Sequence, residues 1–165
     1  MKVMPMENSR STEGLLKPWT NMRVEINDPA PTCDDGQELE VHVLYTTHKG
    51  TLAALKTASQ LTANLSTCPR VLRLYSVPYT LPLERPAVST DFLEEQIRAL
   101  ACESPMEFSA RIYLCREPRW SLRELFPPHS VIVIAGKKRW WPTKEQSWAK
   151  LLRKDGHEVI FLDVK

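Results

Sequence analysis

The chain has 165 residues, of which 42% are hydrophobic and 25% are charged, and its formal net charge is +2. This length suffices for one domain with a buried core, and the composition is that of a globular protein. No stretch approaches about 18 consecutive apolar residues and the N-terminus lacks the apolar core of a signal peptide, so we expect a cytoplasmic protein without a membrane partner.

The first 38 residues are predicted to form an acidic, proline-containing tail ahead of a domain that spans residues 39–165. Seven acidic and four basic side chains lie in the tail, together with Pro5, Pro18, Pro29 and Pro31. Turn signals and the lack of a sustained hydrophobic period argue against a helix or a central strand there. Residues 39–165 carry thirteen acidic and eighteen basic side chains, so positive charge is concentrated in the domain.

From residue 40 the hydrophobic pattern alternates between strand-like and helix-like segments. The predicted order is strand 41–46, helix 51–65, strand 71–77, helix 92–103, strand 110–115, helix 121–126, strand 131–135, helix 143–153 and strand 158–164. Thr90 or Asp91 is expected to cap the second helix, and Thr143 with Gln146 has the spacing of a capping box before the last one. Alternating strands and helices predict a three-layer α/β/α fold around a five-stranded, mostly parallel, doubly wound sheet of the Rossmann-like kind.

Four cysteines, Cys33, Cys68, Cys102 and Cys115, are widely spaced in the sequence. No C-x-x-C pair occurs, and no histidine completes a metal-ligand pattern with them. We therefore expect free thiols and no metal site.

Several segments of residues 40–165 resemble the universal stress protein family in their order and spacing. The matching segments are VLYTT at 43–47, LYSVP at 74–78, EP at 117–118 before LREL at 122–125, SVIVIAG at 130–136, and the closing apolar strand. The resemblance implies a doubly wound, universal stress protein-like domain that works by binding in a stress response or in regulation. It also implies a homodimer formed through the last strand, here Val159, Ile160, Phe161 and Leu162.

Members of that family that bind ATP have an Asp after the first strand and a glycine-rich phosphate loop after the fourth. By position, His48 replaces the Asp, Gly136 matches the first loop glycine, and Arg139 replaces the second. A non-glycine residue rarely lets a phosphate approach the backbone, and we expect Trp140 and Trp141 to crowd the crevice beside Gly136. The resemblance therefore implies a degenerate nucleotide site, without bound ATP or another cofactor.

The segment KKRWW at 137–141 indicates an alternative function. Arg139 can hold a phosphate bidentately, Lys137 can act as a point charge, and Trp140 or Trp141 can stack on a base. This pattern predicts a nucleotide- or nucleic-acid-binding protein, and the opposing interpretation is a packed Trp beside solvated cations. With the ends of the first two strands, the candidate ligand residues are Thr46, Thr47, His48, Val77, Gly136, Lys137, Lys138, Arg139 and Trp140.

Catalysis has little support in the sequence. There is no nucleophile elbow, no P-loop and no metal-ligand pair at helical spacing. An ATP hydrolase is therefore the weakest alternative, and we expect a protein that is not an enzyme. Trp148, Leu151 and Leu152 share one helical face and are predicted to lie in the core.

Overall fold

The structure is a computed structural model that describes residues 2–5, 22–25, 40–65 and 67–165. Its helices are α1 (His48–Thr62), α2 (Thr90–Glu103), α3 (Pro118–Leu125) and α4 (Lys144–Lys154). Its strands are β1 (Lys2–Pro5), β2 (Met22–Glu25), β3 (Val41–Leu44), β4 (Arg70–Ser76), β5 (Ser109–Cys115), β6 (Val131–Gly136) and β7 (Glu158–Asp163). Every strand and helix predicted after residue 40 is present, with ends that differ by a few residues.

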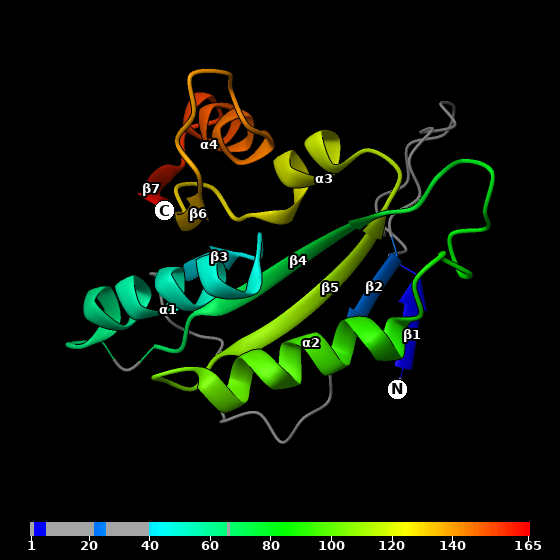
Figure 1. The fold of residues 1–165 in the computed structure, drawn as a ribbon, viewed down its shortest axis with the longest axis horizontal. Coiled ribbons are helices and arrows are strands. Elements are labelled where there is room, and N and C mark those ends of the chain that lie inside the picture. Colours follow the sequence, from blue (N-terminus) through cyan, green and yellow to red (C-terminus); the bar gives the residue numbers. More distant parts are fainter. Residues whose placement is uncertain (1, 6–21, 26–39, 66) are drawn as a thin grey trace.

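One sheet joins these strands in the order β1-β2-β5-β4-β3-β6-β7. The five strands from β3 to β7 run parallel to their neighbours. Helices α1 and α2 cover one face of this parallel sheet, and α3 and α4 cover the other (Figure 1). The predicted doubly wound, three-layer α/β fold is thereby confirmed.

Two further strands come from the segment predicted to be a tail. β2 pairs antiparallel with β5, and β1 pairs antiparallel with β2, so the sheet has seven strands instead of the expected five. Both are short and lie among prolines and polar residues, so the sequence did not indicate a strand at either place. Both lie at an edge of the sheet and not at its centre. The rest of the predicted tail lies outside the described residues.

Alternate side chains of the buried strands pack against the helices on opposite faces of the sheet. In β6, Val131 and Val133 pack beneath α1 and α2, whereas Ile132 and Ile134 pack beneath α3 and α4. A strand buried on both faces reads as a continuous apolar run, and this explains the pattern seen in the sequence. Trp148 of α4 lies in the second cluster, as predicted.

Capping side chains determine where two of the helices begin. Ser89 caps α2, instead of the expected Thr90 or Asp91, because its Oγ accepts the N–H of Phe92 at 3.3 Å. The capping box before α4 is confirmed: the hydroxyl of Thr143 accepts from the backbone N–H three residues on, and the side chain of that residue, Gln146, accepts from Thr143 N–H at 2.8 Å. A helix starts where such a side chain satisfies its free N–H groups.

The cysteines correct one expectation. Cys102 and Cys115 are free thiols, and burial raises the pKa of the Cys115 thiol. Cys68 is disulfide-bonded, so the expectation of thiols throughout is wrong, since spacing in the sequence does not reveal which sulfur atoms the fold brings together. Cys33 lies outside the described residues. The cytoplasmic location stays a prediction, because free thiols and a disulfide point to opposite redox environments.

Membrane-spanning helices are also absent from the described part of the chain, where none of the helices combines the necessary length and apolar character.

Candidate functional site

The direction of the chain reverses at one place in the sheet, between β3 and β6. From β3 the chain continues to β4 on one side, whereas from β6 it continues to β7 on the other. Open α/β sheets bind ligands at such a point, beside the carboxyl ends of the strands. A cavity of about 430 Å³, here called the switch-point crevice, lies there. It is lined by Thr46, Thr47, Lys49, Gly50, Ala135, Gly136, Lys137, Arg139, Thr143, Glu145, Val164 and Lys165.

Threonine side chains engage the backbone on the α1 side of the crevice. The hydroxyl of Thr47 caps α1 by accepting the N–H of Gly50 at 3.1 Å. The N–H of Thr46 donates to the hydroxyl of Thr51 at 3.3 Å, and the hydroxyl of Thr46 donates to the carbonyl of Ala135 at 2.7 Å. These N–H groups already have partners, whereas those of a phosphate-binding helix terminus point at the ligand.

Gly136 is required by the packing of α4 against the sheet. A Cβ atom at this position would lie 2.8 Å from Cβ of Glu145 and 3.3 Å from the ring of Phe161, so the neighbours would have to move. Just beyond it, the N–H of Lys138 donates to Oδ1 of Asp163 at 2.8 Å. Gly136 therefore leaves room for the Glu145 side chain of α4, and the N–H of Lys138 is already hydrogen-bonded to the protein's own Asp163.

Cations outnumber carboxylates around the crevice. Lys49 comes from α1, Lys137 and Arg139 from the loop after β6, and Lys165 from the segment after β7, against Glu145 as the single acidic side chain. None of the four cations forms an ion pair with a carboxylate among the described residues. A concave surface lined by unpaired charges of one sign attracts ligands of the other sign.

The structure brings together five of the nine candidate ligand residues. Those that line the crevice are Thr46, Thr47, Gly136, Lys137 and Arg139. Those that do not line it are His48, Val77, Lys138 and Trp140.

Two of these four are held by the fold itself. His48 is the first residue of α1, which begins three residues earlier than predicted because Thr47 caps it, and its Nε2 lies 3.1 Å from Oε1 of Glu103 on α2. Val77 is 1% exposed and packs in the core beneath α1 and α2. Neither side chain therefore faces a ligand in the switch-point crevice.

The tryptophans after Gly136 project into solvent. Trp140 is 93% exposed, Trp141 is 79% exposed, and neither lines the switch-point crevice. The expectation that these rings crowd the crevice is therefore wrong. Position in the sequence did not reveal that the loop after β6 turns both rings outward, while Glu145 of α4 lies against Gly136.

Several lining residues were not predicted. Lys49, Thr143, Glu145 and Lys165 come from three separate segments, and only the packing of α1, α4 and β7 around the strand ends brings them together. Gly50 had a usable signal, because a glycine in the first turn of a helix lowers helix propensity and so suggests a close approach.

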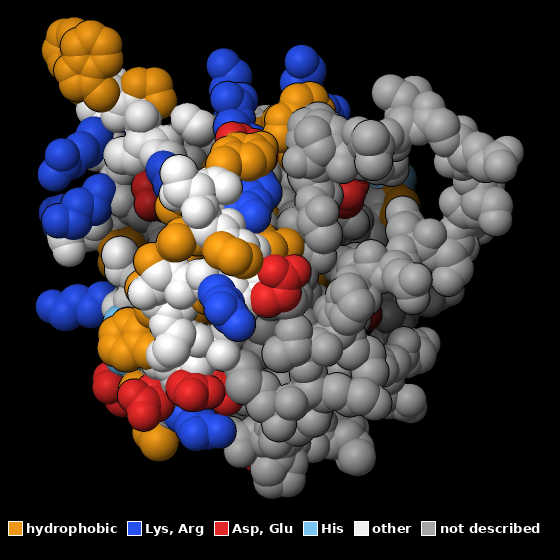
Figure 2. Space-filling view, turned by 90° about the vertical axis from the view of Figure 1, so that its right-hand side faces the viewer, with side chains coloured by type: hydrophobic (Ala, Val, Ile, Leu, Met, Phe, Trp, Pro, Cys, Tyr) orange, Lys and Arg blue, Asp and Glu red, His pale blue; other side chains and the backbone are white. Residues whose placement is uncertain are grey.

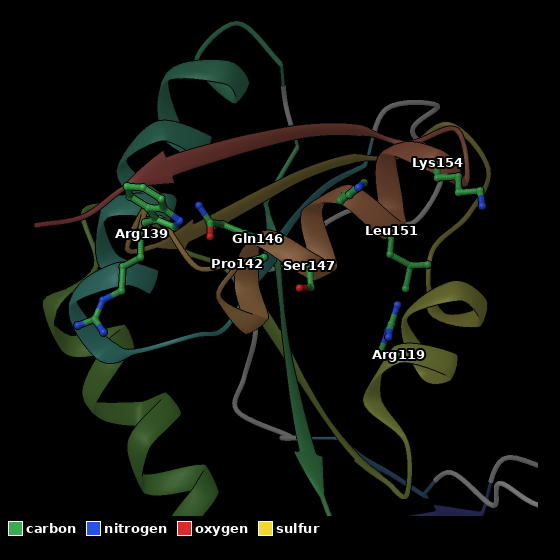
Figure 3. A pocket seen from close by; sticks show the side chains of 9 residues that line it. Arg119, Arg139, Pro142, Gln146, Ser147, Leu151 and Lys154 are labelled. Atoms are coloured by element: carbon green, nitrogen blue, oxygen red, sulfur yellow. The ribbon is translucent and has the colours of Figure 1, made fainter.

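A second cavity, of about 600 Å³, follows the outer side of α4, and we call it the α4 groove (Figure 3). It is lined by Arg119, Arg139, Trp140, Pro142, Gln146, Ser147, Lys150, Leu151 and Lys154. Figure 3 shows Arg139 beyond one end of α4 and Lys154 at the other. Leu151 was predicted to be a core residue, but it is half-buried and lines this groove.

A buried histidine lies at the opposite, amino end of the parallel strands. Nε2 of His42 is 3.3 Å from Oε2 of Glu40, and the same oxygen is 3.3 Å from Nη1 of Arg70. The His42 ring meets the ring of Phe126 edge-on, with centroids 5.1 Å apart. Burial lowers the pKa of His42 to about 4, and the charges of Arg70 and Arg111 add to this effect. His42 is therefore neutral at pH 7 and part of the core.

Metal binding has no support among the described residues, where no three potential metal-ligating side chains gather.

Comparisons with known proteins do not assign the chain to a family. No protein-family model and no curated protein sequence matches the chain. Among solved structures, a macrolide-efflux protein from Streptococcus pneumoniae is similar at a TM-score of 0.43 and 15% identity, over 79% of this chain. The chain covers 47% of that structure, about half of its length. Similarity at this level does not bear on function, and the fold assignment rests on the sheet topology described above.

Proposed function

We propose that this chain is a non-catalytic, universal stress protein-like domain that binds a small phosphorylated ligand in the switch-point crevice. The observation that carries the proposal is the gathering of four cations without carboxylate partners among the described residues, at the point where an open α/β sheet binds its ligands. The segments that resemble the universal stress protein family support the same placement.

The ligand would be held by side chains. The N–H groups of Thr46, Gly50 and Lys138 already have partners, so they do not form the amide cradle of a phosphate loop. Arg139 can grip two phosphate oxygens, and Lys137 adds a point charge. This is the sense in which the nucleotide site is degenerate: the anion is attracted, but the backbone does not surround it.

Binding without turnover fits the polar groups of the crevice. Acid–base or nucleophilic catalysis needs a positioned pair of reactive groups. Here the hydroxyls of Thr46, Thr47 and Thr143 are engaged with backbone groups. The carboxylate of Glu145 has no hydrogen-bonded partner that would make it a base for an attacking group, as far as the described residues show.

Titration calorimetry with ADP and with inorganic pyrophosphate tests this site. Lys137→Ala and Arg139→Ala should each weaken binding about tenfold, as expected when a charge-assisted hydrogen bond is lost. Lys56→Ala is the matched control, because Lys56 is an exposed lysine of α1 that does not line the crevice. Undetectable binding of both probes, or equal affinity in all three variants, would contradict the proposal.

We also propose that two copies pair through β7. This strand lies at one edge of the sheet and pairs with β6 alone among the described strands, so its outer backbone groups can accept another strand. Val159, Ile160, Phe161 and Leu162 pack onto the chain's own core, so the pairing would use the backbone of the edge. Light scattering should give the mass of a dimer, and a monomer at micromolar concentration would exclude this arrangement.

A further inference from the structure

We infer that the α4 groove, together with an adjoining cavity at α3, is a binding surface for single-stranded nucleic acid. This inference goes beyond the switch-point crevice, because it concerns a polymeric ligand and a set of residues that shares only Arg139 with the crevice. It rests on two independent features of the same surface, namely cations without carboxylate partners and exposed tryptophans.

The cations come from two helices and from the loop before α4. Lys150 and Lys154 lie one turn apart on α4, and Arg119 extends from α3 toward Leu151 (Figure 3). These three cations and Arg139 form no ion pair with a carboxylate of the described residues. Like charges four positions apart on a helix repel each other, so Lys150 and Lys154 favour an anionic partner between or over them.

The nearby carboxylates of the same segment do not neutralise the groove. Glu145, the acidic residue of α4, lies against Gly136 at the switch-point crevice. Asp155 follows the helix and is held by Arg123, whose Nε and Nη2 lie 2.9 Å and 3.0 Å from its two oxygens. No acidic side chain therefore lines the α4 groove, whereas Glu117 contributes a carboxylate to the adjoining cavity at α3.

Exposed tryptophans accompany the cations. Trp140 lines the α4 groove and is 93% exposed. Trp120 is 49% exposed and lines an adjoining cavity of about 340 Å³, which shares Arg119 and Leu151 with the groove. The guanidinium of Arg123 lies over the Trp120 ring, 6.0 Å from its centroid, so Trp140 is the main stacking platform. Exposing the apolar surface of an indole ring to water is unfavourable in free energy. The face of such a ring can stack on any base.

The surface view agrees with this arrangement. Figure 2 shows protruding hydrophobic side chains beside Lys and Arg side chains at the top of the molecule, the level at which α3 and α4 lie in Figure 1. Asp and Glu side chains gather at the lower left of this view and are also visible among the cations higher up. Cations interleaved with exposed aromatic rings are the combination that single-strand-binding surfaces use.

The form of the surface favours a single strand over a duplex. The 11 residues of α4 extend over about 16 Å, so the cations along it can contact several phosphates of one strand. Stacking on Trp140 requires an unpaired base, and Gln146 and Ser147 offer hydrogen-bonding groups on the same side of α4. A duplex would meet the cations but leave the indole rings without a base to stack on.

Fluorescence anisotropy of the full chain with labelled oligothymidylate and oligouridylate of about ten nucleotides tests the inference. Trp140→Ala should weaken binding of the single strand about tenfold and leave the weaker binding of a duplex unchanged. Replacing Lys150 and Lys154 together by Ala should weaken both, and should reduce the slope of log affinity against log salt by about 1.4 for a single strand.

Matched controls are available on the other side of the sheet. Phe92→Ala removes an aromatic ring of α2 that is 48% exposed, and Lys56→Ala removes an exposed cation of α1. Neither control should change affinity, and far-UV circular dichroism should be the same in all variants because every substituted side chain is exposed.

Two results would overturn the inference. One is an unchanged affinity in Trp140→Ala and in the double lysine variant. The other is displacement of the oligonucleotide by polyglutamate at equal charge concentration, which would make the surface a general site for acidic polymers. Pyrophosphate binding and its loss in Lys137→Ala report on the switch-point crevice alone, so the failure of one proposal is distinguishable from the failure of the other.

Discussion

At the amino end of the parallel strands, Glu40 lies 3.3 Å from both Arg70 and His42, and the His42 ring is buried against Phe126. At the carboxyl end, Lys137 and its cationic neighbours have no carboxylate partner among the described residues. At the amino end Glu40 is thus paired with Arg70 and the neutral His42 ring is buried, whereas the cations at the carboxyl end are exposed to solvent.

Charged and polar groups at the two ends of the sheet are therefore expected to contribute to different properties, namely stability at the amino end and binding at the carboxyl end. A buried or paired polar group contributes through its protein partners, and its removal leaves those partners unsatisfied. An exposed, unpaired cation contributes little to folding but attracts anions from solution. Changes at the amino end should therefore alter the free energy of unfolding, and changes at the carboxyl end should alter affinity for anions.

The largest expected effect is acid destabilisation by His42. Its pKa is lowered to about 4 in the folded protein, from 6.5 in the unfolded chain. Between these values the unfolded chain binds the proton more readily, so this contribution to stability is complete above pH 6.5 and is lost progressively as the pH falls toward 4. The difference amounts to about 3 kcal/mol.

Urea unfolding at a series of pH values measures this effect. His42→Gln should flatten the pH dependence between pH 6.5 and 4, whatever its own cost in packing. His129→Asn is the control, because His129 is exposed and its φ of 61° suits asparagine. An equally steep pH dependence of stability in His42→Gln would show that His42 does not cause the acid destabilisation. Burial also lowers the pKa of His157, so a small slope should remain.

The second largest change in the free energy of unfolding is expected for Gly136→Ala. This substitution tests whether the carboxyl end also contains a residue that matters for stability alone. The added methyl group would meet Cβ of Glu145 at 2.8 Å, and we expect a loss of about 2 kcal/mol in the free energy of unfolding. Chemical denaturation measures the loss. Glu145→Gly in the same chain should restore part of it, because it removes the atoms that clash. A fully stable Gly136→Ala protein would show that α4 can move away from β6.

The smallest effect should come from Glu145→Gln. Removing the one acidic side chain of the switch-point crevice should raise the affinity for pyrophosphate about threefold, or about 0.6 kcal/mol, because the ligand then meets less repulsion. Glu158→Gln is the matched control, since Glu158 is exposed at the amino end of β7. Equal gains in both variants would mean that net charge, and not the crevice, determines binding.

The candidate site was only partly predictable. Thr46, Thr47 and Gly136 were found because strand ends can be located from apolar runs, and strand ends line the crevice of an open sheet. Glu145 and Lys165 were not found, because their relation to those strand ends depends on how α4 and β7 pack. Trp140 was assigned to the crevice on sequence proximity alone, but its ring projects into solvent and lines the α4 groove.

The sequence by itself determined the succession of buried strands and covering helices after residue 40, because hydrophobic periodicity is a local property that each segment carries with it. Only the tertiary structure decided the rest: the pairing of β1 and β2 with the edge of the sheet, the bonding of Cys68, and the division of the cations between the crevice and the α4 groove. These features arise from contacts between residues far apart in the chain, and such contacts leave no periodic signal in any single segment.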